Sequence, residues 1–192
     1  MNSNKRRQFI KAGAATLLLP SAAISTAFAN SDYGIIGQTA PELEIEQWID
    51  AEGKTASAFK LADHKGKYIF MEFWQSWCPG CHSHGFPSLK KISDAFADNK
   101  DFVAVSIQTT FEGYDTNTFK KVHKIQKQYD LKIMMGHDTG DKKSQGHPKT
   151  MISYRSGGTP WAVLISPEGK VIFNGFSVKP ESVIDFLNKK IT

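Results

Sequence analysis

The fold of this chain is decided by one stretch, Tyr68-Ile69-Phe70-Met71-Glu72-Phe73-Trp74-Gln75-Ser76-Trp77-Cys78-Pro79-Gly80-Cys81. Its first seven residues are nearly all apolar, which is typical of a central strand buried on both faces. After the two cysteines, apolar side chains recur at helical spacing at Leu89, Ile92 and Phe96. The stretch therefore predicts a buried strand that leads through a cysteine pair into a helix covering residues 79–98.

Strands and helices alternate on both sides of this stretch. Further strands are predicted at residues 43–49, 59–61, 102–107, 131–135, 161–165 and 171–173. Further helices are predicted at residues 119–129, 151–154 and 180–187. The polar segment 111–118 and the predicted loop 136–149 could shape a substrate site or be plain surface. The alternation, closed by a hairpin and a helix, predicts an α/β domain of three layers.

The chain has two cysteines, Cys78 and Cys81, separated by two residues. A disulfide between them would restrict the unfolded chain less than the roughly 3 kcal/mol expected for a fifteen-residue loop. The pair is therefore better suited to chemistry than to stability. Cys78 is expected at the helix start, where unpaired N–H groups and the helix dipole favour a thiolate. Cys81, one turn further, is expected to be the resolving thiol, which breaks a mixed disulfide formed at Cys78.

The segment Phe73–Cys81 resembles the active-site segment of the thioredoxin superfamily, and most closely that of its exported TlpA/ResA-like group. The resemblance spans residues 37–187. Other features agree with it: Glu72, Pro87, the run Gly158-Thr159-Pro160, and the lead-in at Gly37–Pro41 and Gly66-Lys67. It implies a thioredoxin-like three-layer sandwich with a central mixed sheet, flanking helices and a short N-terminal strand extension. The implied activity is thiol–disulfide oxidoreduction of protein substrates, without a cofactor or a metal.

The resemblance also implies roles for individual residues. Glu72 would be a buried acid beneath Cys81, and its apolar neighbours support burial, which would raise its pKa and let it accept the Cys81 proton. Pro160 would follow a cis peptide bond and face the Cys78–Cys81 disulfide. Trp77 is expected to cover the thiols. Residues expected to contact substrate are Thr159, Trp77, Pro79 and Gly80.

The first twenty-nine residues are typical of a targeting signal. The run 5–11 (KRRQFIK) resembles the twin-arginine export motif, and Ala27-Phe28-Ala29 is a pattern that a signal peptidase accepts. We therefore expect a signal peptide at 1–29, cleavage before Asn30, a thioredoxin-like domain at 30–192 and a periplasmic or otherwise extracytoplasmic location. An ordinary signal peptide and an uncleaved anchor are the alternatives, although the strongly apolar part is too short to span a bilayer.

The charge of the chain excludes one class of partner. The formal net charge is +5, but four basic residues lie before Asn30 and no acid precedes Asp32. Without that segment the net charge is +1, which is too small for a general nucleic-acid-binding surface. We expect no nucleic-acid partner, and a monomer.

Three other interpretations use the same residues. The run Cys78-Pro79-Gly80-Cys81-His82 matches the C-x-x-C-H attachment site of c-type haem, but then Glu72 and Pro160 have no explanation. A metal or copper-delivery module could add histidines to the thiols, although copper-delivery relatives of this fold space their cysteines by three residues. The candidate ligands are His82, His84, His137 and His147. Of these, His82 and His84 are otherwise expected to be solvated or to tune Cys78. A peroxiredoxin would place Thr and Pro before a lone cysteine, and that pattern is absent.

The direction of electron flow is open at this stage. A stabilised thiolate at Cys78 makes the couple more oxidising, whereas the resemblance favours a reductase. A reductase outside the cytoplasm needs electrons delivered across the membrane, so a membrane thiol donor is implied. An oxidase of the same fold is the alternative.

Overall fold

The computed structural model describes residues 33–141 and 146–191, and the predicted signal at 1–29 lies outside them. The described strands form one sheet in the order β2-β1-β5-β4-β3-β6-β7. Their bounds are β1 (Gln47–Ile49), β2 (Thr55–Ala56), β3 (Tyr68–Trp74), β4 (Phe102–Thr110), β5 (Met134–Thr139), β6 (Trp161–Ile165) and β7 (Val171–Gly175). Strands β3, β4 and β5 run parallel, whereas β1, β6 and β7 pair antiparallel. The predicted mixed sheet is confirmed.

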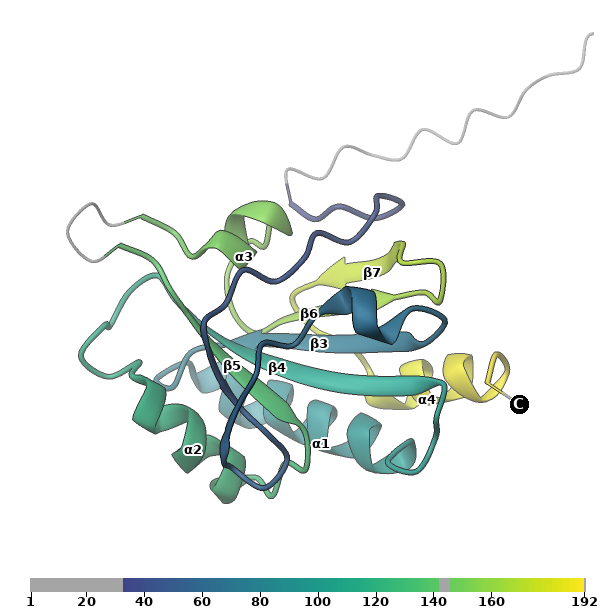
Figure 1. Cartoon of the computed structure of the whole chain (residues 1–192), viewed down its shortest axis with the longest axis horizontal. Helices are drawn as coiled ribbons and strands as arrows, with labels where there is room; N and C mark the ends of the chain where they lie inside the picture. Colours follow the sequence, from purple (N-terminus) through teal and green to yellow (C-terminus); the bar gives the residue numbers. More distant parts are fainter. Residues whose placement is uncertain (1–32, 142–145, 192) are drawn as a thin grey trace, which may run out of the picture. The chain divides into compact units, whose positions relative to one another are not determined.

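Helices cover both faces of this sheet. They are the 3-10 helix η1 (Leu61–His64), the π-helical turn η2 (Cys81–Gly85), α1 (Phe86–Ala95), α2 (Phe119–Gln128), α3 (Lys149–Ser153) and α4 (Pro180–Asn188). Helices α1, α2 and α4 lie on one face, while α3 and the segment before β3 lie on the other (Figure 1). The result is the three-layer α/β arrangement that the sequence predicts.

Strand β3 is the centre of the hydrophobic core. Phe70 and Trp74 face the layer of α1, α2 and α4, while Met71 and Phe73 face the opposite layer. All four side chains are fully buried, because each face of the strand is covered. Each such side chain contributes about 1.5–3 kcal/mol relative to exposure. The run of apolar residues therefore anchors a rigid strand directly before the two cysteines.

The predicted position of one strand was wrong. Residues 131–135 were expected to form a strand and residues 136–149 a loop, but β5 runs over Met134–Thr139. Gly136 is needed there because a Cβ on it would lie 2.9 Å from the ring of Trp48 on the neighbouring strand. His137 and Asp138 follow it in the strand and are buried. These polar residues do not fit the apolar pattern of a buried strand, so the sequence did not predict the position of β5.

The segment around Phe59 and Leu61 also differs from expectation. A short strand or bend was predicted, but Leu61 begins the 3-10 helix η1. The Glu42 carboxylate accepts the backbone N–H groups of Leu61 and Ala62, each at 2.9 Å. A side chain nineteen residues away in sequence thus satisfies the first donors of this turn.

None of the helices that the structure describes has the length and apolar character needed to cross a membrane.

Candidate active site

The cysteine pair lies where β3 turns into the first helix. Strand β3 ends at Trp74, and helical backbone begins at Pro79. The Phe86 N–H donates to the Cys81 carbonyl in a wide π-type turn. Pro87 accounts for the widening, because proline has no N–H to donate and crowds the preceding turn. Strand, turn and helix therefore hold both cysteines in one rigid segment.

The two sulfurs have different surroundings. Cys78 and Cys81 are free thiols in this structure, and both are buried. The Cys81 N–H donates to Cys78 Sγ at 3.2 Å, and the Cys78 thiol donates to the Thr159 carbonyl at 3.4 Å. Cys81 is fully inaccessible to solvent. Burial is the main cause that raises the pKa of its thiol, and its hydrogen bond with Cys78 raises that pKa further. Cys78 Sγ thus accepts a backbone N–H, whereas Cys81 is the thiol whose pKa is raised by burial.

The loop before β6 faces the pair from the opposite side. The Thr159–Pro160 peptide bond is cis, as the resemblance implied. A Cβ on Gly80 would lie 3.1 Å from Pro160 Cδ, so the helix start and the proline are in close contact. A larger residue at position 80 would therefore be in tight contact with Pro160.

Glu72 is buried beneath this contact. It is 2 % exposed, and loss of hydration raises the pKa of its carboxyl group to about 8. A Cβ on Gly85 would lie 2.6 Å from Glu72 Oε1 and 3.1 Å from Pro160 Cβ. The carboxyl group thus lies against the helix one turn beyond Cys81. The predicted burial is confirmed, and its role as proton acceptor stays a prediction.

A narrow cavity leads to this carboxyl group. Its volume is about 10 Å³, and His84, Ser88, Pro160 and Phe176 line it together with Glu72. That is close to the space one water molecule needs. Glu72 therefore borders a space that could hold about one water molecule.

Trp77 lies on the outer side of the pair. Its side chain is 45 % exposed, and a Cβ on Gly113 would lie 3.1 Å from its indole ring. The loop 111–118 therefore packs closely against the indole ring of Trp77. Pro79 is exposed beside it. Substrate contacts at Thr159, Trp77, Pro79 and Gly80 remain predictions.

His82 has partners that the sequence did not indicate. Its Nδ1 lies 2.6 Å from the Tyr129 hydroxyl and its Nε2 lies 2.8 Å from the Ser76 carbonyl oxygen. A carbonyl only accepts, so Nε2 carries a proton here, and in the neutral ring Nδ1 accepts from Tyr129. The expectation of a solvated His82 was wrong. Tyr129 is distant in sequence, so no local pattern could have paired them.

Asn117 is a second connection that the sequence missed. It is 1 % exposed and accepts the Ser76 N–H at Oδ1 over 2.7 Å. Its Nδ2 donates to Gln75 Oε1 and to the Glu112 carbonyl, each at 2.9 Å. One buried amide thus ties the loop 111–118 to the residues just before Trp77. The polar character of that loop was the only signal in the sequence.

We expect Asn117→Ala to destabilise the protein by about 1–3 kcal/mol, because it leaves the partly buried Ser76 N–H and the buried Gln75 Oε1 without their partner. Urea unfolding followed by circular dichroism measures this. Asn188→Ala, on an exposed position at the end of α4, is the matched control and should stay within about 0.5 kcal/mol of the parent. Equal midpoints for the two variants would show that the Asn117 network contributes nothing.

The four histidines considered as metal ligands do not converge on the thiols. His84 is exposed and lies 2.7 Å from the Ser83 hydroxyl, while His137 is buried on β5. His147 stacks near Phe111, with ring centroids 5.9 Å apart. In the part of the chain that the structure describes, no three His, Cys, Asp or Glu side chains gather as a metal site would need.

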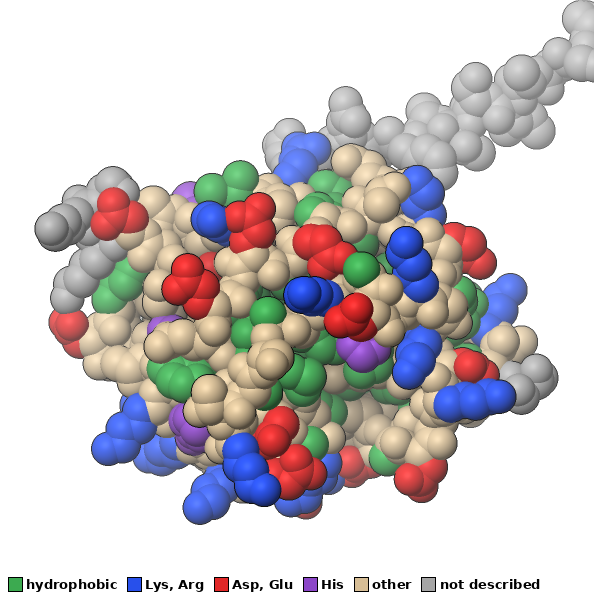
Figure 2. Space-filling model, in the orientation of Figure 1, with side chains coloured by type: hydrophobic (Ala, Val, Ile, Leu, Met, Phe, Trp, Pro, Cys, Tyr) green, Lys and Arg blue, Asp and Glu red, His purple; other side chains and the backbone are tan. Residues whose placement is uncertain are grey.

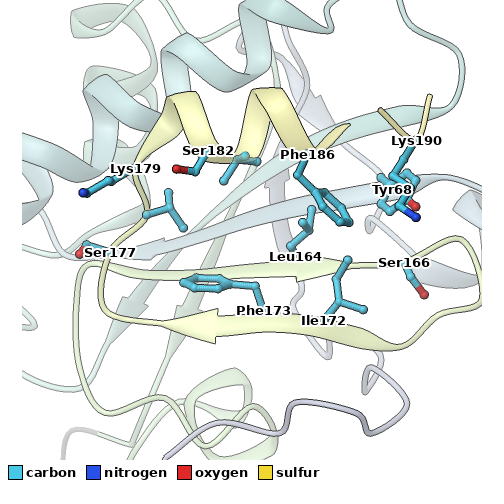
Figure 3. A pocket seen from close by; sticks show the side chains of 12 residues that line it. Tyr68, Leu164, Ser166, Ile172, Phe173, Ser177, Lys179, Ser182, Phe186 and Lys190 are labelled. Carbon is cyan, nitrogen blue, oxygen red and sulfur yellow. The ribbon is translucent and has the colours of Figure 1, made fainter. Parts of the chain in front are cut away.

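A larger cavity lies away from this chemistry. It has a volume of about 590 Å³ and lies between α4 and strands β6 and β7 (Figure 3). Leu164, Phe173 and Phe186 supply apolar walls. Its lining includes neither cysteine nor Glu72 nor Pro160, so it forms no part of the site around the thiols.

Comparison with known proteins agrees with this geometry. The family model described as "AhpC/TSA family" matches residues 36–174, which include both cysteines, Glu72 and Pro160. The chain belongs to the AhpC/TSA family. It is 29 % identical to "Thiol-disulfide oxidoreductase ResA" of Bacillus subtilis over 189 residues, covering 96 % of this chain and 93 % of the relative.

Solved structures give the same result. The "Thioredoxin-like superfamily protein SPOA0173" is 30 % identical, with a TM-score of 0.69 over 80 % of this chain and 95 % of that one. A "Thiol-disulfide Isomerase" from Corynebacterium glutamicum is 26 % identical, with a TM-score of 0.65 over 79 % and 96 %. The fold is thioredoxin-like, and the chain is an enzyme of the thiol–disulfide oxidoreductase class.

Proposed function

We propose that this chain reduces disulfides in protein substrates outside the cytoplasm, through a dithiol–disulfide cycle of Cys78 and Cys81. One observation carries the proposal. The Cys81 N–H and the Thr159 carbonyl converge on Cys78 Sγ, while Cys81 is inaccessible and its pKa is raised by burial. The two thiols therefore differ in the way that a nucleophile and a resolving thiol must differ.

The cycle transfers two electrons to the substrate. The Cys78 thiolate attacks one sulfur of the substrate disulfide, the substrate S–S bond breaks, and one substrate thiolate leaves with a proton from solvent. A mixed disulfide now joins Cys78 to the substrate sulfur that was attacked. Cys81 then loses its proton and attacks Cys78 Sγ, which releases the second substrate thiol. The protein is left with a Cys78–Cys81 disulfide, and the substrate holds two thiols.

Glu72 is the proposed acceptor of the Cys81 proton. Its pKa of about 8 means that a minor fraction of its carboxyl groups is ionised near neutral pH and can take a proton. The carboxyl group lies one helical turn from Cys81, against Gly85, and next to a cavity with space for about one water. The accepted proton leaves through that cavity.

The disulfide form must be reduced again for the next cycle. Outside the cytoplasm this requires a donor that carries electrons across the membrane, and we propose a membrane thiol protein in this role. With electrons flowing the other way, the same residues would oxidise substrate thiols. The match to a "Thiol-disulfide oxidoreductase" is compatible with either direction, and the TlpA/ResA-like resemblance favours the reductase.

The reduction potential of the Cys78–Cys81 couple tests the direction. Equilibration with glutathione redox buffers, followed by thiol alkylation and mass spectrometry, gives its value. A reductase should lie closer to about −270 mV, as in known reducing couples, than to about −120 mV, as in known oxidants. A value near the second figure would overturn the reductase and support the oxidase.

Export is the part of the proposal that rests on residues 1–29. Protein from the native host, analysed by intact mass, should begin at or near Asn30. Changing both Arg6 and Arg7 to Lys should block export if the twin-arginine route is used. Mature extracytoplasmic protein that still carries Met1 would contradict cleavage, and unimpaired export of the double variant would indicate a general route.

A further inference from the structure

Helix α2 (Phe119–Gln128) presents a lysine face to solvent. Its basic residues are Lys120, Lys121, Lys124 and Lys127, and the helix contains no acid. Lys120, Lys124 and Lys127 are exposed, while Val122 and Ile125 point into the core. None of the four lysines forms an ion pair with any residue that the structure describes. Among residues 33–141 and 146–191, no ion pair therefore neutralises their charge.

This charge is concentrated rather than spread. The chain after Ala29 has a net charge of +1, so the region outside α2 is net acidic. Several lysines elsewhere are paired instead, among them Lys90 with Asp94, Lys91 with Glu181, and Lys149 with Glu44. Figure 2 shows Lys and Arg side chains gathered at the lower left, where α2 lies in Figure 1. An unpaired cluster of one sign creates a local positive potential that a balanced surface lacks.

The two ends of α2 lie beside the segment that carries the cysteine pair. Asn117, just before α2, accepts the Ser76 N–H at 2.7 Å. Tyr129, just after α2, lies 2.6 Å from His82 through its hydroxyl. Both ends of the helix are thus attached to the segment that carries Cys78 and Cys81.

A partner that reaches Cys78 also reaches the loop that leads into this helix. Protein interfaces cover about 800 Å² on each side, which corresponds to a circular patch of about 16 Å radius. Lys120 follows Asn117 by three positions, so the two residues are separated by at most about 11 Å. Asn117 in turn contacts Ser76, two positions before Cys78. A patch centred on Cys78 therefore reaches the loop around Asn117 that leads into α2.

We propose that the lysine face of α2 docks an acidic surface of the protein partner whose disulfide or thiols exchange with Cys78, and this rests on the proposed function. Charges at the rim of an interface chiefly raise the association rate and select partners of complementary sign. The exposed positions of α2 are Lys and Gln, with no large apolar side chain to enter a bilayer. An acidic protein is therefore favoured over an anionic lipid surface.

Two synthetic peptides test this. Each contains the same internal disulfide, flanked in one by four glutamates and in the other by four lysines. The reduced full-length protein should reduce the acidic peptide about tenfold faster than the basic one at about 10 mM salt, and this preference should shrink at about 200 mM. A neutral dialkyl disulfide, 2-hydroxyethyl disulfide, reports the exchange reaction itself.

Two triple variants complete the experiment. Lys120→Gln, Lys124→Gln and Lys127→Gln together should remove most of the preference and leave the rate with 2-hydroxyethyl disulfide unchanged. The matched control changes Lys60, Lys65 and Lys189 to Gln, the same charge at exposed sites off α2, and should keep the preference. The inference is overturned if the α2 variant keeps the preference, or if the parent shows none and instead binds anionic phospholipid vesicles. Failure of the parent to reduce the neutral disulfide would count against the proposed function instead.

Discussion

Cys78→Ala should lower the rate of disulfide reduction by about three orders of magnitude or more, because it removes the nucleophile of the cycle. The rate with a protein disulfide substrate under excess reductant measures this. The variant should remain folded, because cysteine and alanine differ by one sulfur atom, and near-native circular dichroism would confirm that. Ser83→Ala, an exposed position in the same helical segment, is the control and should react at the parent rate. Activity in Cys78→Ala within tenfold of the parent would contradict the account.

Glu72→Gln should change the pH dependence of stability more than any other single substitution described here. The pKa of Glu72 is raised from 4.5 to about 8 in the folded protein, so between these values the folded state binds more protons than the unfolded state. Stability from this group is therefore lost as pH rises through that window, by up to about 1.4 kcal/mol per pH unit. The glutamine variant does not pay this cost, so its stability relative to the parent should rise steadily from pH 5 to pH 8.

Urea unfolding at several pH values measures that difference. Burial lowers the pKa of His137 to about 4, so His137 removes stability as pH falls below 6.5, but it is present in parent and variant alike. Subtracting the two curves isolates Glu72. Glu46→Gln, at an exposed acid, is the control and should give a flat difference. A flat difference for Glu72→Gln would show that this carboxyl group is not desolvated.

Glu72→Gln also tests whether Glu72 accepts the proton of Cys81. If Glu72 accepts the Cys81 proton, Glu72→Gln should slow release of the mixed disulfide and change the pH profile of that step, while attack by Cys78 keeps its rate. Stopped-flow measurements of the two steps separate them. Unchanged release kinetics at every pH would remove Glu72 from the mechanism and leave the fold and the cysteine pair untouched.

The sequence could predict what depends on local pattern. The apolar run 68–74 predicted β3 because a strand buried on both faces admits few polar residues. Helical spacing predicted α1 and α2, and Pro180 marked the start of α4 to the residue. The cis peptide before Pro160 came from family resemblance, since a Thr-Pro pair alone does not specify an isomer.

What the sequence could not predict depends on distant partners. Strand β5 contains Gly136, a residue that is rare in strands, because the ring of Trp48 occupies the space where a side chain at position 136 would lie. Trp48 lies far earlier in the chain. His82 is held by Tyr129, and Ser76 by Asn117, across separations of 47 and 41 residues. Such contacts exist only once the sheet has brought these segments together. They are also the contacts that fix the backbone on either side of Cys78.

Trapping of the mixed disulfide tests the central claim most directly. Cys81→Ala and Cys78→Ala proteins are each mixed with a disulfide-containing protein substrate, quenched with acid and analysed by non-reducing electrophoresis and intact mass. Cys81→Ala should accumulate a covalent complex through Cys78 that disappears on reduction, whereas Cys78→Ala should form almost none, because the remaining thiol is inaccessible and its pKa is raised by burial. A stable complex with Cys78→Ala and none with Cys81→Ala would contradict the assignment of nucleophile and resolving thiol.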